Sequence, residues 1–320
     1  MIGAILKRAN LQRADLSLAN LTTADLEDSN LRAANLRNST LNGASLQNAL
    51  LQPQKVNGVS TPADLRFAKI RNANLANAQM QRVQLAEAEF IDAVLTGANL
   101  MHAKMTPGTV ISRSNLEQAY LIKADMTRIV MQNSNLTGAI LIGAVLENAS
   151  LSHSTFVESQ LTKTNLRYAA LDNADLSRAL IISAALDNAN LRNANLSGAI
   201  LLSSTLSNAN ITGATLDGAQ MSRAVLRDAN MDGASAVRAF LVEADLSGAS
   251  LKKSDLTSAD FRDADLTRAD LAGALLRNAS FAGANLDGAI LMEVRNLTCD
   301  QIRTAKNWRT TKRSTPLAGC

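Results

Sequence analysis

Few residues of this chain have side chains that could do chemistry. The only histidines are His102 and His153, and the only cysteines are Cys299 and Cys320. Each histidine follows a leucine by two positions, and no CxxC or metal-ligand spacing occurs. The sequence also contains no P-loop and no HExxH motif. We therefore expect no catalytic residue, no cofactor, no metal and no enzymatic activity.

The densest group of carboxylates could suggest a cation site. Its members are Asp255, Asp260, Asp263, Asp265 and Asp270. Calcium requires six to eight oxygens that converge on one point. Arg262 and Arg268 lie among these carboxylates, and the spacing spreads them around the backbone rather than toward one centre. We therefore interpret the group as a solvated surface.

The elements that position these residues follow from a repeat of five residues. A large apolar residue, usually leucine, recurs in the frame Ala-(Asp/Asn)-Leu-x-x, as in Ala14-Asp15-Leu16 and Ala194-Asn195-Leu196. On a helix, successive leucines would lie about 140° apart, and on a flat strand they would alternate between faces. A bend in each repeat keeps every leucine on the inside. Such a chain coils into a solenoid.

A narrow core explains the other positions of the repeat. The residue two before each central apolar residue is nearly always Ala, Ser or Thr, and the remaining three positions are mostly polar. One large and one small inward residue fill a narrow interior to protein-like density. Aromatic residues make up only 3% of the chain. Phe90, Phe156, Phe261 and Phe281 occupy central positions, where we expect them to fill the core locally.

This frame resembles the pentapeptide-repeat family over about residues 1–51, 65–105 and 114–291. The resemblance implies an all-β fold, a right-handed quadrilateral β-helix with four repeats per coil and about fourteen coils. The solenoid domain is expected over residues 1–297, with loops at 52–64 and 106–113 where Pro53, Pro62 and Pro107 break the register. Both breaks are interpreted as bulged loops in one column, and a hinge between two shorter columns is the alternative.

A different pattern follows Leu291. Thr298 and Gln301 have the spacing of a helix capping box, which predicts a short capping helix over residues 298–308, from about Cys299 to Asn307. The segment looks like a cap found on some bacterial pentapeptide-repeat proteins. Ile302, Ala305 and Trp308 are expected to cover the last coil. Residues 309–320 are predicted to form a disordered basic tail.

Outward-facing large apolar residues recur in pairs at multiples of twenty positions. We call these ten residues the apolar stripe: Tyr120, Ile122, Ile140, Ile142, Leu180, Ile182, Ile200, Leu202, Phe240 and Val242. With twenty residues per coil they fall on one side of the solenoid. A contiguous apolar patch usually marks an interface, although β-propensity alone also favours Ile, Val and Tyr on strands. The stripe predicts a non-enzymatic protein-interaction or structural solenoid whose partner is another protein or a second copy.

Charge bears on the alternative functions. The net charge is +4, and the segment 292–320 holds six basic and two acidic residues, 6 − 2 = +4, so the solenoid body is neutral. Some family members imitate DNA and bind a topoisomerase such as DNA gyrase, which requires a strongly acidic surface. Here arginines interleave with the acidic residues, which disfavours that alternative. Nucleic-acid contact is expected only as weak binding by the basic tail.

Localisation has only indirect signals in the sequence. No apolar run approaches the length of a membrane span, and the first residues have no signal-peptide pattern. We expect a cytoplasmic protein with no membrane partner and no small-molecule substrate.

Overall fold

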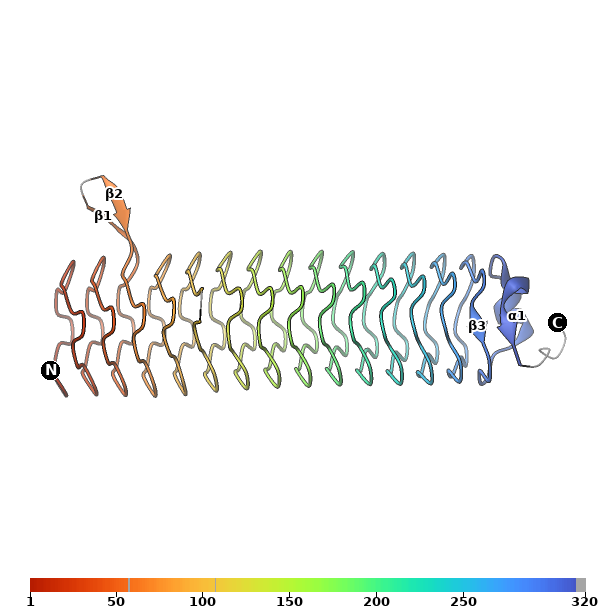
Figure 1. Cartoon of the computed structure of the whole chain (residues 1–320), viewed down its shortest axis with the longest axis horizontal. Helices are drawn as coiled ribbons and strands as arrows, with labels where there is room; N and C mark the ends of the chain where they lie inside the picture. The colour runs from red at the N-terminus through yellow and green to blue at the C-terminus, as the bar shows by residue number, and fades with distance from the viewer. Residues whose placement is uncertain (57, 107, 315–320) are drawn as a thin grey trace. The chain divides into compact units, whose positions relative to one another are not determined.

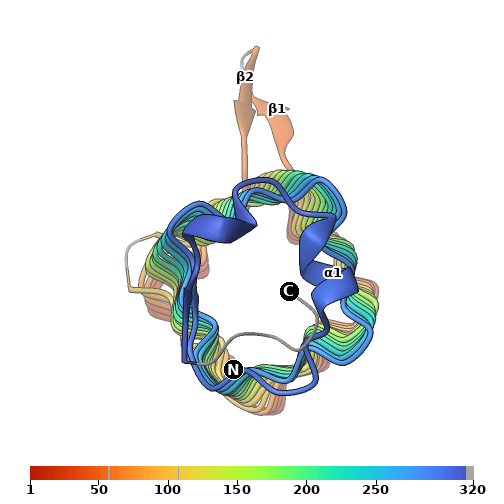
Figure 2. The same cartoon turned by 90° about the vertical axis from the view of Figure 1, so that its right-hand side faces the viewer.

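The computed structural model describes residues 1–56, 58–106 and 108–314. The chain forms two compact units, Met1–Asn165 (unit 1) and Leu166–Cys320 (unit 2). Each unit is a stack of similar coils (Figure 1), and each coil follows a four-sided path when viewed along the stack (Figure 2). The predicted solenoid is therefore present in each unit. A single column of about fourteen coils over residues 1–297 stays a prediction.

Each repeat contains a four-residue turn that begins at the central residue. At Leu21, the Ala24 N–H donates to Leu21 O (3.0 Å), and Thr23, the third residue of the turn, has a φ of 55°. Gly, Asn and Asp tolerate this left-handed region best, which explains their frequency at this position. The residue before the centre stabilises the turn, because Asn20 Oδ1 accepts from the Thr22 N–H (3.1 Å). The Asp/Asn position of the frame thus has a structural role.

Hydrogen bonds between parallel backbone segments join neighbouring coils. Asp25 pairs with Ser45 in unit 1, and Asn195 pairs with Thr215 in unit 2. The Leu26 N–H donates to Ser45 O (2.7 Å). The partners are twenty residues apart in the regular stretches, so four repeats make one coil within each unit, as the sequence predicts.

The central residues and the small residues two positions earlier form the core of both units. From Leu21 to Leu291, every central residue is at most 2% exposed. The four central phenylalanines are buried as expected. Phe261 and Phe281 lie on consecutive coils, and their rings stack with centroids 5.3 Å apart and an interplanar angle of 3°. An aromatic pair thus replaces the usual leucine pair at this point of the core.

Two insertions interrupt unit 1. In the first, β1 (Gln54–Val56) and β2 (Val59–Thr61) form an antiparallel hairpin that projects from its coil (Figure 1), so the predicted loop at 52–64 is partly a hairpin. Leu50 pairs with Gln79, which is 29 positions later, so the insertion adds nine residues to the coil. The second insertion adds one residue, since Glu89 pairs with Val110. Coil stacking continues across both insertions within the described residues.

The last part of unit 2 contains the remaining elements. These are β3 (Ile290–Leu291), α1 (Cys299–Arg303), the 3-10 helix η1 (Trp308–Thr310) and β4 (Lys312–Arg313). A capping box opens α1, with the Gln301 N–H donating to Thr298 Oγ1 (3.3 Å) and the Thr298 N–H donating to Gln301 Oε1 (2.8 Å). Gln301 Nε2 also donates to Leu276 O (2.8 Å) in the preceding coil. Ile302 of α1 is fully buried.

Three expectations for this segment need correction. The helix α1 ends at Arg303 and does not continue to Asn307. Asn307 has a left-handed φ of 55°, which ends any helical path before η1. Trp308 is only partly buried, and the guanidinium groups of Arg309 and Arg313 stack on its ring at 4.9 and 5.3 Å.

The predicted disorder of 309–320 is wrong for residues 309–314, because β4 pairs in parallel with β3 and the Lys312 N–H donates to Ala289 O (2.9 Å). Residues 315–320 of the predicted tail lie outside the described residues.

Candidate functional site

The stripe residues of unit 1 lie on consecutive coils. Tyr120 pairs with Ile140 in the β-ladder. Ile122 O accepts from the His102 N–H and Ile142 O accepts from the Lys123 N–H, which places these two isoleucines at equivalent positions one coil apart. Tyr120 is 43% exposed. The three isoleucines are partly exposed, so all four side chains face outward.

The stripe residues of unit 2 show the same arrangement with one interruption. Leu180 pairs with Ile200, Ile200 pairs with Gln220, and Gln220 pairs with Phe240, so a polar residue separates two apolar groups. Phe240 is 47% exposed. The other stripe residues of this unit are partly exposed: Leu180, Ile182, Ile200, Leu202 and Val242. Unit 2 therefore presents two coils with apolar pairs and, after one polar coil, a third.

The side chains that could take part in catalysis or metal binding do not form a common site among the described residues. His102 and His153 are both exposed at the left-handed position of their turns, with φ of 57° and 59°. Among the described residues, no group of His, Cys, Asp and Glu side chains is arranged to hold a metal ion. Of the clustered carboxylates, Asp260 is paired with Arg262 (2.7 Å) and Asp270 with Lys252 (3.2 Å). No helix in the described part of the chain could span a membrane.

The acidic residues considered for DNA mimicry are accompanied by paired cations. These residues are Asp125 and Glu147 in unit 1 and Asp187, Asp228, Asp245, Asp265 and Asp287 in unit 2. In unit 2, Arg167 pairs with Asp187 (3.1 Å), and Arg227 pairs with Asp245. Pairs of opposite charge cancel much of the field that a DNA mimic needs.

Asp260 provides a test of these charge pairs. Burial raises the pKa of this carboxyl, but hydrogen bonds from the Arg262 side chain and backbone outweigh that effect and lower the pKa below 3.8. A lowered native pKa stabilises the fold above pH 3.8, and this stabilisation disappears as the pH falls through the native pKa. We expect Arg262→Gln to reduce the free energy of unfolding well above pH 3.8 and to have little effect well below it.

Urea denaturation at several pH values measures this effect. Arg238→Gln is the matched control, because Arg238 has no ion pair with a carboxylate among the described residues. The same pH dependence in both variants would contradict the assignment to the Asp260–Arg262 pair.

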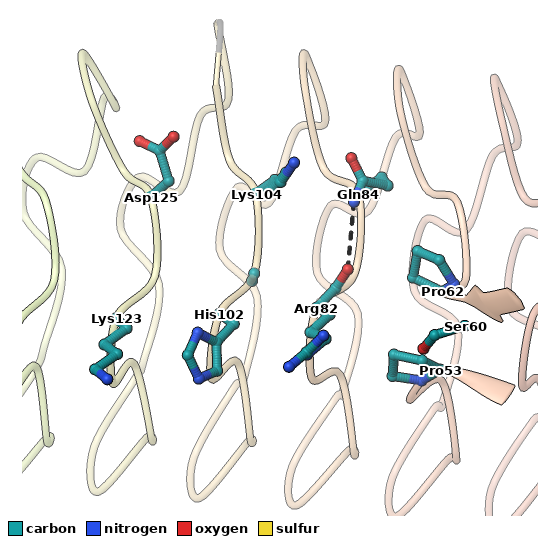
Figure 3. Close-up of a pocket in the computed structure, with 10 residues that line it drawn as sticks. Pro53, Ser60, Pro62, Arg82, Gln84, His102, Lys104, Lys123 and Asp125 are labelled. Atoms are coloured by element: carbon teal, nitrogen blue, oxygen red, sulfur yellow. Dashed lines mark hydrogen bonds between the residues drawn. The ribbon is translucent and has the colours of Figure 1, made fainter. Parts of the chain in front are cut away.

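A groove lies beside the hairpin in unit 1, although the repeat pattern suggests a column without a concave pocket. Its volume is about 480 Å³, and Pro53, Ser60 and Pro62 form the wall nearest the hairpin. Two rows of side chains from successive coils line the rest (Figure 3). Arg82, His102 and Lys123 form one row, and Gln84, Lys104 and Asp125 form the other. The nine-residue insertion supplies this wall of the groove, which the regular repeat lacks.

The sequence contained a weak signal for this groove. Pro53 and Pro62 mark the ends of the inserted segment, and Arg82, His102 and Lys123 recur at intervals of 20 and 21 residues. The second interval includes the one-residue insertion, so a strict twenty-residue count does not align the third residue with the other two.

Comparison with known proteins identifies the repeat. The profile of the family described as Pentapeptide repeats matches most of the chain, at residues 1–22, 29–52, 63–100, 110–148, 129–167, 139–178, 159–201, 189–228, 204–241, 225–263 and 259–295. No curated protein matches the sequence significantly.

Solved structures of pentapeptide-repeat proteins are similar to the chain. HetL from the cyanobacterium Nostoc sp. strain PCC 7120, which is involved in the regulation of heterocyst differentiation, is 30% identical over 80% of this chain and 89% of its own, with a TM-score of 0.22. A protein from the Arabidopsis thaliana thylakoid lumen is 36% identical over 32% of this chain and 73% of its own, with a TM-score of 0.21. QnrB1, a plasmid-mediated fluoroquinolone resistance protein, is 14% identical over 64% of this chain and 90% of its own, with a TM-score of 0.31. On the match of the family profile, the chain belongs to the pentapeptide-repeat family, whose fold is a right-handed quadrilateral β-helix.

Proposed function

We propose that this protein is a non-enzymatic interaction solenoid that presents the apolar stripe to a protein partner or to a second copy of itself. The observation that carries the proposal is the register between coils. Tyr120 pairs with Ile140 in unit 1 and Leu180 pairs with Ile200 in unit 2, so apolar side chains of successive coils lie side by side. A cytoplasmic setting belongs to the same proposal. So does a capping role for α1, in which Gln301 protects carbonyl groups of the preceding coil.

The physical basis is a rigid array of apolar side chains. Burial of apolar surface contributes about 25 cal/mol per Å², so covering the outward side chains of the stripe in either unit favours association. The ladder hydrogen bonds already fix the backbone under each side chain. A partner therefore binds without the entropic cost of ordering a loop.

The decisive variant replaces four stripe residues by serine: Ile140, Leu180, Ile200 and Leu202. We expect it to abolish self-association in light scattering, or capture of a partner in pull-down, while the circular dichroism spectrum stays unchanged. These side chains face solvent, so their replacement leaves the core intact.

The matched control replaces four outward apolar residues outside the stripe by serine: Val130, Val145, Val225 and Leu275. Each directly precedes a central residue, as Ile140, Leu180 and Ile200 do. The control should associate like the unmodified protein. Association that survives the stripe variant, or that is lost equally in the control, would sink the proposal. Inhibition of gyrase supercoiling by the purified protein would instead favour the DNA-mimic alternative.

A further inference from the structure

The groove beside the hairpin has a cationic lining that is not neutralised. Arg82, Lys104 and Lys123 are exposed, and none forms an ion pair with a carboxylate among the described residues. Other arginines of unit 1 do have such partners, for example Arg66 with Asp64 at 2.6 Å and Arg113 with Asp92 at 2.8 Å. The groove therefore brings together three cations without such a partner, unlike these paired positions.

Only one acidic residue lines the groove. Asp125 Oδ1 accepts hydrogen bonds from the Thr127 N–H (3.3 Å) and Thr127 Oγ1 (2.9 Å), so this carboxylate is engaged by its own turn. The three cations exceed it by two charges, and the imidazole of His102 adds a further hydrogen-bonding group. The lining thus favours an anion.

The coils fix the spacing of the cationic row. The Arg82 N–H donates to Met101 O and the His102 N–H donates to Ile122 O, both at 2.9 Å, so Arg82, His102 and Lys123 lie on three consecutive coils. Neighbouring coils are ~4.8 Å apart, so the row extends over ~10 Å. Lys104 lies in the second row (Figure 3), so donors reach the groove from two sides.

From this geometry we infer that the groove binds a short oligophosphate group. Such a group carries closely spaced negative charges along a short chain, which matches donors spread over two coil steps. Arginine and lysine both form charge-assisted hydrogen bonds with phosphate oxygens. A volume of about 480 Å³ is in the range of small-ligand sites. No Phe, Tyr or Trp lines the groove, so it lacks the stacking surface typical of single-stranded nucleic-acid sites.

Isothermal titration of the full chain with sodium tripolyphosphate at low ionic strength tests the inference. We expect saturable binding to one site, and a Kd at least about tenfold higher in the double variant Arg82→Gln/Lys123→Gln. The matched control is Arg238→Gln/Arg268→Gln, which removes the same two charges from the same left-handed turn position outside the groove. An equal loss of affinity in both double variants indicates diffuse attraction and overturns the inference, as does the absence of binding by the unmodified protein.

The wall of the groove is tested separately. Replacing Gln54–Thr61 by two glycines removes the hairpin, whose first and last residues are already paired. This variant should retain the coil stacking, because Leu50 and Gln79 pair outside the deleted segment. We expect weaker tripolyphosphate binding with an unchanged circular dichroism spectrum. Unchanged affinity would show that the groove is not the site.

Two further probes define the ligand. Citrate carries three carboxylates, and binding as tight as that of tripolyphosphate would overturn the assignment to phosphate. Adenosine triphosphate separates the two sources of an oligophosphate. A Kd equal to that of tripolyphosphate assigns the free group, and a lower Kd assigns a nucleotide; both results uphold the inference.

Discussion

Replacing Phe261 by alanine is expected to lower the free energy of unfolding by about 3–5 kcal/mol. The ring is fully buried and stacks on Phe281, with centroids 5.3 Å apart. Alanine loses the free energy gained by burying the phenyl ring. It also leaves a cavity that the hydrogen-bonded coils cannot easily close. It also removes the aromatic contact, which contributes a further ~0.5–1.5 kcal/mol in other proteins.

Urea denaturation followed by circular dichroism measures the effect. Phe261→Leu is the control, because leucine occupies most other central positions and should cost less than about 1.5 kcal/mol. The double variant with Phe281→Ala should differ from the sum of the single variants, since the two rings are in contact. A loss below about 1 kcal/mol for Phe261→Ala would contradict the proposed packing.

Replacing Leu191 by aspartate is expected to have a still larger effect. Leu191 is fully buried at the centre of a repeat, and its neighbours in the adjacent coils, Leu171 and Ile211, are fully buried too. A carboxylate there has no partner, and burying it should cost at least about 4 kcal/mol. Leu191→Met keeps the volume and is expected to cost less than about 1.5 kcal/mol.

The damage from Leu191→Asp should also be local. In a solenoid each coil contacts only its neighbours, so unfolding spreads from the altered coil. Hydrogen exchange measured by mass spectrometry should show the greatest loss of protection in unit 2, with peptides from the first coils of unit 1 least affected. A uniform loss of protection along the chain would show that the protein unfolds as one cooperative unit instead.

The sequence predicts the structure well where a residue's burial depends only on its position within the five-residue repeat. The five-residue period predicts that Leu21, Phe261 and their equivalents are buried, because any other path of the chain would expose them. It also predicts that the stripe residues face outward in each unit, as Tyr120 and Phe240 do. These features depend on local bends and on the spacing of twenty residues.

Features that depend on interruptions were not predictable in the same way. The hairpin at Gln54–Val56 and Val59–Thr61 has no repeat pattern, so only its prolines marked it. The groove requires side chains from three coils together with the hairpin wall. Lys312–Arg313 pairs with Ile290–Leu291 because the last coil offers a free strand edge. The basic composition of the segment does not predict this pairing.

The nine-residue insertion has a practical consequence for engineering this scaffold. The two strands leave and re-enter the same coil, and the next coil pairs in its normal order, with Asn35 against Asp64 and Leu50 against Gln79. Gly58 and Val59, near the tip of the hairpin, are exposed, with Val59 65% accessible. A reporter epitope or a small foreign domain grafted between β1 and β2 should therefore leave the stack undisturbed, which makes this site a natural attachment point for labels.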